Sequence, residues 1–206
     1  MKLSYETFLV NDVLPDDLLD YDPDFSIKEF LSRKRSFLSK LAVEGSDLLY
    51  PDWLDAVCCE NNLNPKVILV NLQKEQSLVT KKSKPPEKIM KRALGFGMTD
   101  SGDIEKYYGF AKQNIAAIKW YNKNISSASR KLSEGKKLSI TVDAGLLKLT
   151  TATVNTYLLY KYTPWTGAPG SYYARKWGIH GVYLFWKLWK QWWRKDLKKY
   201  NHVDFS

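Results

Sequence analysis

The chain has 206 residues, of which 44% are hydrophobic, so it can bury a core and is most simply one domain. Its formal net charge of +10 favours an anionic partner such as nucleic acid, anionic lipid or a bacterial wall. The start of the chain lacks the apolar run of a signal peptide, and no segment reaches the roughly 18 uninterrupted apolar residues of a membrane span. The two cysteines, Cys58 and Cys59, are adjacent, and neighbouring cysteines rarely bridge each other, so a disulfide framework is excluded.

The N-terminal part of the chain differs in composition from the rest, because it is acidic and carries two prolines. We expect an extended arm over residues 1–25, without an assigned role, followed by one domain over residues 26–206. Ser26 is a suitable N-cap for a helix that reaches about residue 41. A second helix is expected over about 51–60.

The next helix carries the most informative residue of the chain, Glu75. Asn64 is a good N-cap, and Pro65 suits the first helical position, where no N–H is needed. One face of this helix follows the spacing i, i+4, i+7, i+11, with Ile68, Leu72, Glu75 and Val79. Glu75 is therefore expected to point into the interior, while Lys74 points elsewhere.

A carboxyl group in an apolar stripe has two interpretations. A buried carboxylate is costly unless it is paired or stays protonated. In the first interpretation, Glu75 lies at the edge of the core and is satisfied by a salt bridge. In the second, it stays protonated near neutral pH, as a general acid for glycoside cleavage requires.

The remaining regular segments are assigned from periodicity and from turn residues. We expect helices over about 87–92, 103–121, 150–162 and 181–195 and a strand over 138–142. Loops or turns are expected at 81–86, 93–98, 100–103 and 167–170. Gly95 and Gly97 flank Phe96 and indicate close backbone approach or unusual dihedral angles. The fold is therefore predicted to be mostly α-helical with a small β element.

The last of these helices has an aromatic stripe formed by Trp186, Trp189 and Trp193 at spacing i, i+3, i+7. Such a helix with lysines opposite could lie on a membrane surface. Closing a domain core is the more common role of such a stripe, and we favour it here.

Residues 64–76, NPKVILVNLQKEQ, resemble the segment "NPKVLLVTLQKEQ" of a group of bacterial lysozyme-like proteins. That group is similar to soluble lytic transglycosylases and goose-type lysozymes, glycoside hydrolase family 23. The resemblance implies a lysozyme-like domain with a substrate groove between lobes and assigns Glu75 as the catalytic acid. The family's usual Glu-Ser pair is interrupted here by Gln76, so Ser77 takes the neighbouring substrate-binding position only by analogy.

Three further segments resemble motifs of the same group. Residues 92–97 and 107–113 are similar to its "RATGYG" and "GFFNQ" segments, and one of the two should replace the transglycosylase "GLMQ" motif beside the acid. Gly109 with Gln113 is our choice, because the Gln amide can hydrogen-bond a sugar N-acetyl group or the Glu. Residues 160–165 resemble "YNYTPY", at the position of the "AYN" motif whose Tyr bonds the acid, so Tyr160 or else Tyr162 takes that role.

Aromatic side chains and a glycine complete the predicted substrate site. Flat rings stack on sugar faces, and the expected substrate-binding residues include Phe96, Gly97, Tyr108 and Trp165. Each of the predicted site residues outside the Glu75 segment also has a plainer interpretation as a packing or capping residue.

The reaction implied by the resemblance is cleavage of the β-1,4 bond between N-acetylmuramic acid and N-acetylglucosamine in peptidoglycan, without metal or cofactor. Hydrolysis needs a second carboxylate at a defined separation, for which Asp100, Asp103 and Asp143 are candidates, each more simply a turn residue or cap. Transglycosylases need none, because the sugar's own substituent assists and gives a 1,6-anhydro product. Both products remain open.

Two other functions were weighed against the enzyme. A wall-binding module that lost turnover would keep the same groove, whereas a nucleic-acid binder would use the basic and aromatic residues but give Glu75 no purpose. We therefore expect glycan strands rather than nucleic acid as partner, at the cell wall, outside the cell or in a phage particle. The sequence does not specify an oligomeric state.

Overall fold

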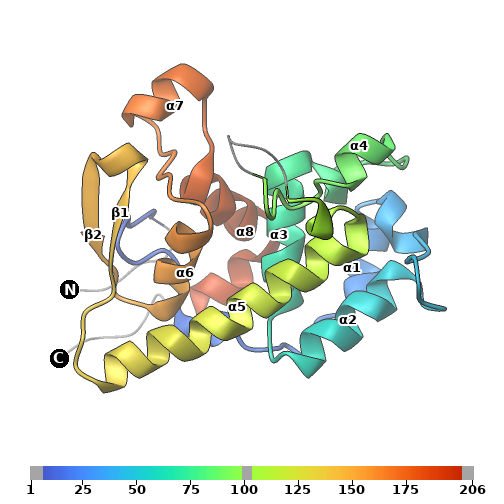
Figure 1. Ribbon diagram of the computed structural model, residues 1–206, viewed down its shortest axis with the longest axis horizontal. Helices are drawn as coiled ribbons and strands as arrows, with labels where there is room; N and C mark the ends of the chain where they lie inside the picture. The colour runs from blue at the N-terminus through green and yellow to red at the C-terminus, as the bar shows by residue number, and fades with distance from the viewer. Residues whose placement is uncertain (1–6, 99–103, 201–206) are drawn as a thin grey trace. The chain divides into compact units, whose positions relative to one another are not determined.

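The computed structural model describes residues 7–98 and 104–200, and these are mostly helical (Figure 1). The described helices, in chain order, are α1 (Ile27–Arg33), α2 (Tyr50–Glu60), α3 (Pro65–Gln76), α4 (Glu87–Met90), α5 (Phe110–Ser133), α6 (Val154–Tyr162), α7 (Tyr172–Trp177) and α8 (Gly181–Lys198). The strands β1 (Ser139–Val142) and β2 (Leu147–Thr150) form an antiparallel hairpin with Ser139 opposite Thr150. The prediction of a mostly α-helical fold with a small β element is confirmed.

The chain separates into two compact units. The first comprises residues 1–18 and 124–206, and the second comprises residues 19–123, so the division falls inside α5. This differs from the expected arm at 1–25 followed by one domain. In the described residues 7–25, the buried side chains of Val13, Leu14, Leu18 and Leu19 contribute to the cores of the two units instead of forming an appendage.

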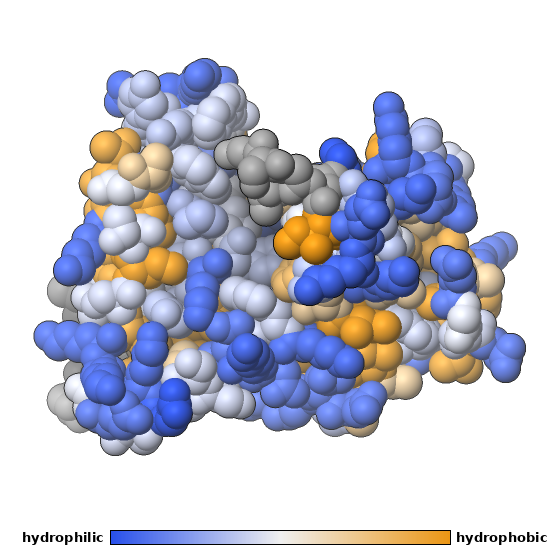
Figure 2. All heavy atoms as spheres, in the orientation of Figure 1, coloured by the Kyte–Doolittle hydropathy of each residue, from blue (hydrophilic) through white to orange (hydrophobic). Residues whose placement is uncertain are grey.

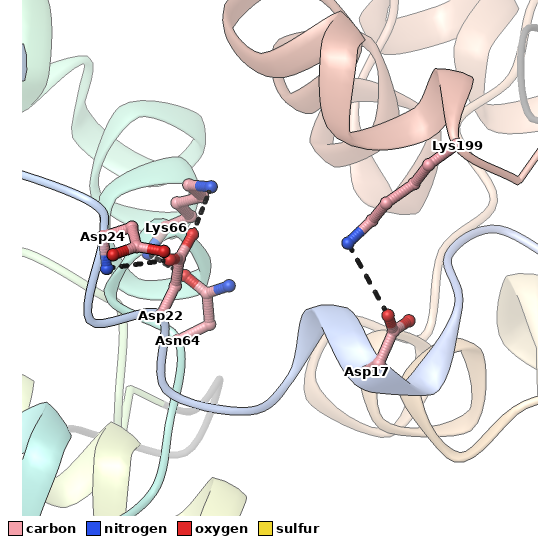
Figure 3. A network of polar contacts seen from close by, with 6 residues as sticks. All are labelled: Asp17, Asp22, Asp24, Asn64, Lys66 and Lys199. Carbon is pink, nitrogen blue, oxygen red and sulfur yellow. Dashed lines mark hydrogen bonds and ion pairs between the residues drawn. The ribbon is translucent and has the colours of Figure 1, made fainter.

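In the unit of residues 19–123, the helix starts follow the sequence signals. The Ser26 hydroxyl accepts a hydrogen bond from the Glu29 backbone N–H at 3.2 Å and starts α1. The entry to α3 is fixed further by an ion pair at 2.8 Å between Asp22 and Lys66, whose side chain is only 6% exposed (Figure 3). The ammonium of Lys66 also lies 4.9 Å from the centre of the Phe25 ring.

In the other unit, residues before position 19 pack on α6. The Thr156 hydroxyl accepts a hydrogen bond from the Val13 backbone N–H at 2.8 Å, and Asp16 accepts one from the Asn155 N–H at 2.8 Å. Asp17 also forms an ion pair at 3.7 Å with Lys199, just after α8 (Figure 3). These contacts join segments about 140 or more residues apart in sequence, which explains why the sequence pattern alone left the N-terminal segment unplaced.

Several element boundaries differ from the sequence prediction. The helix expected to reach residue 41 ends at Arg33, because Arg35 adopts φ +52° and Ser36 starts a separate short turn. The helix expected to end at 121 continues to Ser133 through a polar stretch, and both β2 and α7 were missed. Apolar residues of the hairpin remain on the surface, as Figure 2 shows over β1 and β2.

The aromatic stripe of α8 faces the protein interior. Trp186, Trp189 and Trp193 are all less than 10% exposed, and Trp189 is completely buried. The stripe therefore packs the core of its unit, as favoured from the sequence. Among the helices of residues 7–98 and 104–200, none combines the length and apolar character required to cross a membrane.

The start of α8 is held by a close backbone crossing. Gly181 has φ +59°, and a Cβ there would lie 2.2 Å from the Trp165 carbonyl oxygen. The N–H groups of Val182 and Tyr183 donate to the carbonyl groups of Trp165 and Thr166, both at 2.9 Å. A side chain at residue 181 would therefore force the two backbones apart.

We expect Gly181→Ala to lower the free energy of unfolding by about 2–3 kcal/mol through strain and backbone displacement. Gly145→Ala is the matched control, because Gly145 also has positive φ, at +91°, but no atom within 4 Å of the added Cβ. Its cost should be about 1 kcal/mol. Urea denaturation of both variants measures the difference, and equal losses would contradict the steric explanation.

Candidate functional site

The helix that carries Glu75 runs from the core to the surface. The Asn64 side chain accepts a hydrogen bond from the Lys66 N–H at 3.0 Å, and Pro65 occupies the first turn, as predicted. Residues 65–72 are buried and residues 73–76 are half-buried. Ser77 then ends α3 with φ +55°. Glu75 therefore lies in the last turn, where the helix leaves the core, and Val79 belongs to a following short turn.

The environment of the Glu75 carboxylate differs from the dry pocket expected from the sequence. Its side chain is 30% exposed, and its Oε1 lies 2.8 Å from the Nζ of Lys74, whose side chain is only 6% exposed. The expectation that Lys74 points elsewhere is therefore wrong, because the long lysine side chain reaches back to its neighbour. This geometry agrees with the alternative interpretation of a core-edge carboxylate in a salt bridge.

The other carboxylate oxygen faces the glycine-rich loop. A Cβ at Gly95, which has φ +66°, would lie 3.8 Å from Glu75 Oε2. Gly97 has φ +75°, and a Cβ there would lie 2.4 Å from the Tyr107 ring. The predicted unusual dihedral angles are confirmed at both glycines, and close approach is confirmed at Gly97. The loop that resembles "RATGYG" therefore lies beside Glu75.

Gln113 holds this loop through all four hydrogen-bonding positions of its amide, and its side chain is fully buried. Its Oε1 accepts from the N–H groups of Leu94 at 3.2 Å and Phe96 at 2.9 Å. Its Nε2 donates to the carbonyl groups of Phe96 at 2.8 Å and Tyr107 at 2.9 Å. An amide has two donors and two acceptor lone pairs, so Gln113 positions the loop instead of binding sugar or Glu75 directly.

Two buried polar residues lie near Glu75 that the sequence analysis did not select. Asn71 donates from its amide to the Val67 carbonyl at 3.1 Å and to the Tyr121 hydroxyl at 3.2 Å. Burial raises the pKa of Tyr121, the hydrogen bond from Asn71 opposes this, and the Glu75 carboxylate adds to the rise. Asn71 is four residues before Glu75 on the same helix face, which is the signal that could have indicated it.

The surface beside Gln76 is hollowed by a cavity of about 520 Å³. Its lining consists of Gln76, Lys88, Ile89, Lys91, Arg92 and Tyr108. Tyr108 was selected from the sequence as a substrate-binding residue, whereas the three cations were not. Ser77 is exposed, and Phe96 is half-buried with its ring 5.0 Å from that of Tyr107.

Three predicted site residues belong to the other unit. Tyr160 is fully buried, and its hydroxyl has no hydrogen-bond partner among the described residues. Burial and, to a smaller extent, the Asp143 carboxylate raise the pKa of Tyr160. Tyr162 is half-buried at the end of α6, and the half-buried Trp165 packs edge-on against Tyr173 at 4.6 Å.

The carboxylates considered as second catalytic groups divide into two cases. Asp143 is buried and accepts hydrogen bonds from the Thr166 N–H at 2.8 Å and the Thr166 hydroxyl at 2.6 Å. It therefore joins the turn between β1 and β2 to the segment at Thr166. Asp100 and Asp103 lie outside the described residues. Within residues 7–98 and 104–200, no three His, Cys, Asp or Glu side chains are grouped as a metal site would require.

Cys58 is buried and Cys59 exposed, both as free thiols, and burial raises the pKa of the Cys58 thiol.

Comparison with protein-family models, with curated proteins and with solved structures finds no match to this chain.

Proposed function

We propose that the protein cleaves peptidoglycan glycan strands at the β-1,4 bond between N-acetylmuramic acid and N-acetylglucosamine, with Glu75 as the general acid. The main support is the position of the Glu75 carboxyl. A helix anchored in the core brings it to the surface, with Oε2 toward the Gly95 backbone and a polar cavity at the adjacent Gln76. A rigid helix end is a suitable support for a catalytic group.

The acid role requires that the carboxyl carry a proton when glycan is bound. In the proposal, a sugar over the exposed side of Glu75 excludes water from the carboxyl group, and the proton must be held against the attraction of the Lys74 ammonium at 2.8 Å. The glycines at 95 and 97 allow the loop backbone to approach that sugar, since no Cβ intervenes. Tyr108 and Phe96 are the proposed aromatic contacts of that sugar.

A wall-binding module without turnover is the second candidate. It is favoured by the ion pair between Lys74 and Glu75, because a carboxylate held by a nearly buried ammonium can serve a purely structural role. Both candidates place the protein at the cell wall, outside the cell or in a phage particle. They differ in whether covalent bonds of the glycan are broken.

Digestion of purified peptidoglycan tests the proposal. We expect the protein to release soluble muropeptides, identified by mass spectrometry, because Glu75 protonates the leaving oxygen of the glycosidic bond. Anhydro ends would identify a transglycosylase and reducing ends a hydrolase. Binding to sacculi without release of any fragment would instead support the non-catalytic module.

A further inference from the structure

The cavity beside Gln76 is unusual in its charge. Lys88, Lys91 and Arg92 line it, with no Asp or Glu among its lining residues. Lys88 and Lys91 have exposed side chains. Figure 2 shows hydrophilic side chains gathered over α4. The cavity is therefore suited to an anionic group, which three neighbouring cations attract more strongly than any one alone.

The positive charge of the whole chain is also concentrated there. Residues 81–92 contain six Lys or Arg and one carboxylate, that of Glu87. The net charge of this segment is therefore half of the formal net charge of +10 of the whole chain. Glu87 and Glu44 line a neighbouring cavity of about 450 Å³, which shares Lys91 and Tyr108 with the cavity at Gln76. The cavity at Gln76 is thus the place in this segment where cations converge without a carboxylate in the wall.

The backbone connects this cavity directly to Glu75 on two sides. Gln76 follows Glu75 in the last turn of α3, and successive Cα atoms are about 3.8 Å apart. The Gly95 N–H, in the loop facing Glu75 Oε2, donates to the Arg92 carbonyl at 3.0 Å. An anionic substituent on a sugar held at Glu75 would therefore lie within reach of Lys91 and Arg92.

We infer that this basic cavity binds the carboxylates of the peptide stem carried by the muramic acid at the cleaved bond. The inference rests on the proposed function and adds a preference for peptide-bearing strands. Carboxylate and phosphodiester groups share the oxyanion chemistry that Lys and Arg recognise. The stem is favoured over a wall phosphodiester because it is attached to the sugar that would lie beside Glu75.

Binding measurements with the Glu75→Gln protein separate this inference from turnover. The ligands are uncross-linked glycan strands, freed of wall phosphopolymer, either with their peptide stems or after an amidase has removed them. We expect about tenfold tighter binding to the peptide-bearing strands, weakening with salt. The double variant Lys88→Ala with Lys91→Ala should lose this preference and bind the two strand types about equally.

The matched control removes two lysines from the exposed face of α5 in the same unit, Lys119→Ala with Lys123→Ala, and should keep the tenfold preference. An equal loss in the control, or equal wild-type binding to both strand types, would overturn the inference while leaving the proposed function intact. Tighter binding only to strands that retain phosphopolymer would also overturn it. Absence of binding to any strand, with shifts of nucleic acid instead, would overturn the proposed function itself.

Discussion

Replacing Glu75 with Gln is expected to lower the rate of glycan-strand cleavage by about a thousandfold or more, because the amide cannot donate the proton that the leaving oxygen needs. The fold should persist, since Gln preserves the side-chain volume and its amide oxygen can still accept a hydrogen bond from Lys74. We expect a stability change of about 1 kcal/mol. Muropeptide release measures the first effect and urea denaturation the second.

Glu60→Gln is the matched control for this substitution. Glu60 is exposed at the end of α2, in the same unit. Its replacement removes the same charge from the unit without touching the site, so cleavage should stay within a factor of two of wild type. A Glu75→Gln protein that cleaves within a factor of about three of wild type would exclude the acid role.

The ion pair with Lys74 offers a second way to separate catalysis from structure. Lys74→Met breaks the same contact from its other side while keeping a long apolar stem in a nearly buried position. If Glu75 is only a structural partner, the two substitutions should reduce stability similarly and neither should abolish cleavage selectively. The acid role predicts that Glu75→Gln loses cleavage while Lys74→Met, with a similar loss of stability, retains it.

Local signals in the sequence were sufficient for the helix that carries the candidate acid. Asn64 and Pro65 specify where the chain enters α3 through short-range hydrogen bonding and a fixed φ, and these effects need no knowledge of the tertiary structure. The face of Glu75 also followed from helical spacing. Its exposure did not, because periodicity gives the direction of a side chain but not the point at which the helix leaves the core.

The polar contacts of the site were less accessible to sequence reasoning. Gln113 was selected as an amide that would bind the sugar or Glu75, but its four partners are backbone groups of residues 94–107, and no side-chain pattern identifies them. The reach of Lys74 to its neighbour depends on rotamers. The basic cavity combines residues from three separate segments, whose convergence only the fold defines.

Replacing Gln113 with Ala is expected to lower the free energy of unfolding by about 4 kcal/mol, since each of its four hydrogen bonds contributes roughly 1 kcal/mol and the N–H of the buried Leu94 would be left unpaired. Gln113→Glu should be no better, because an ionised carboxylate has no N–H to offer the carbonyl groups of Phe96 and Tyr107. Urea denaturation measures both variants. Gln191→Ala, exposed on α8, should change stability by less than about 0.5 kcal/mol.

Amide hydrogen exchange distinguishes a loop anchor from a sugar ligand at residue 113. The N–H groups of Leu94 and Phe96 both donate to Gln113, so their exchange should accelerate in Gln113→Ala relative to amides in α2. Cleavage should fall as well, because the loop then loses its fixed position beside Glu75. A variant that loses cleavage with unchanged stability and unchanged exchange at residues 94 and 96 would instead return Gln113 to direct contact with the glycan.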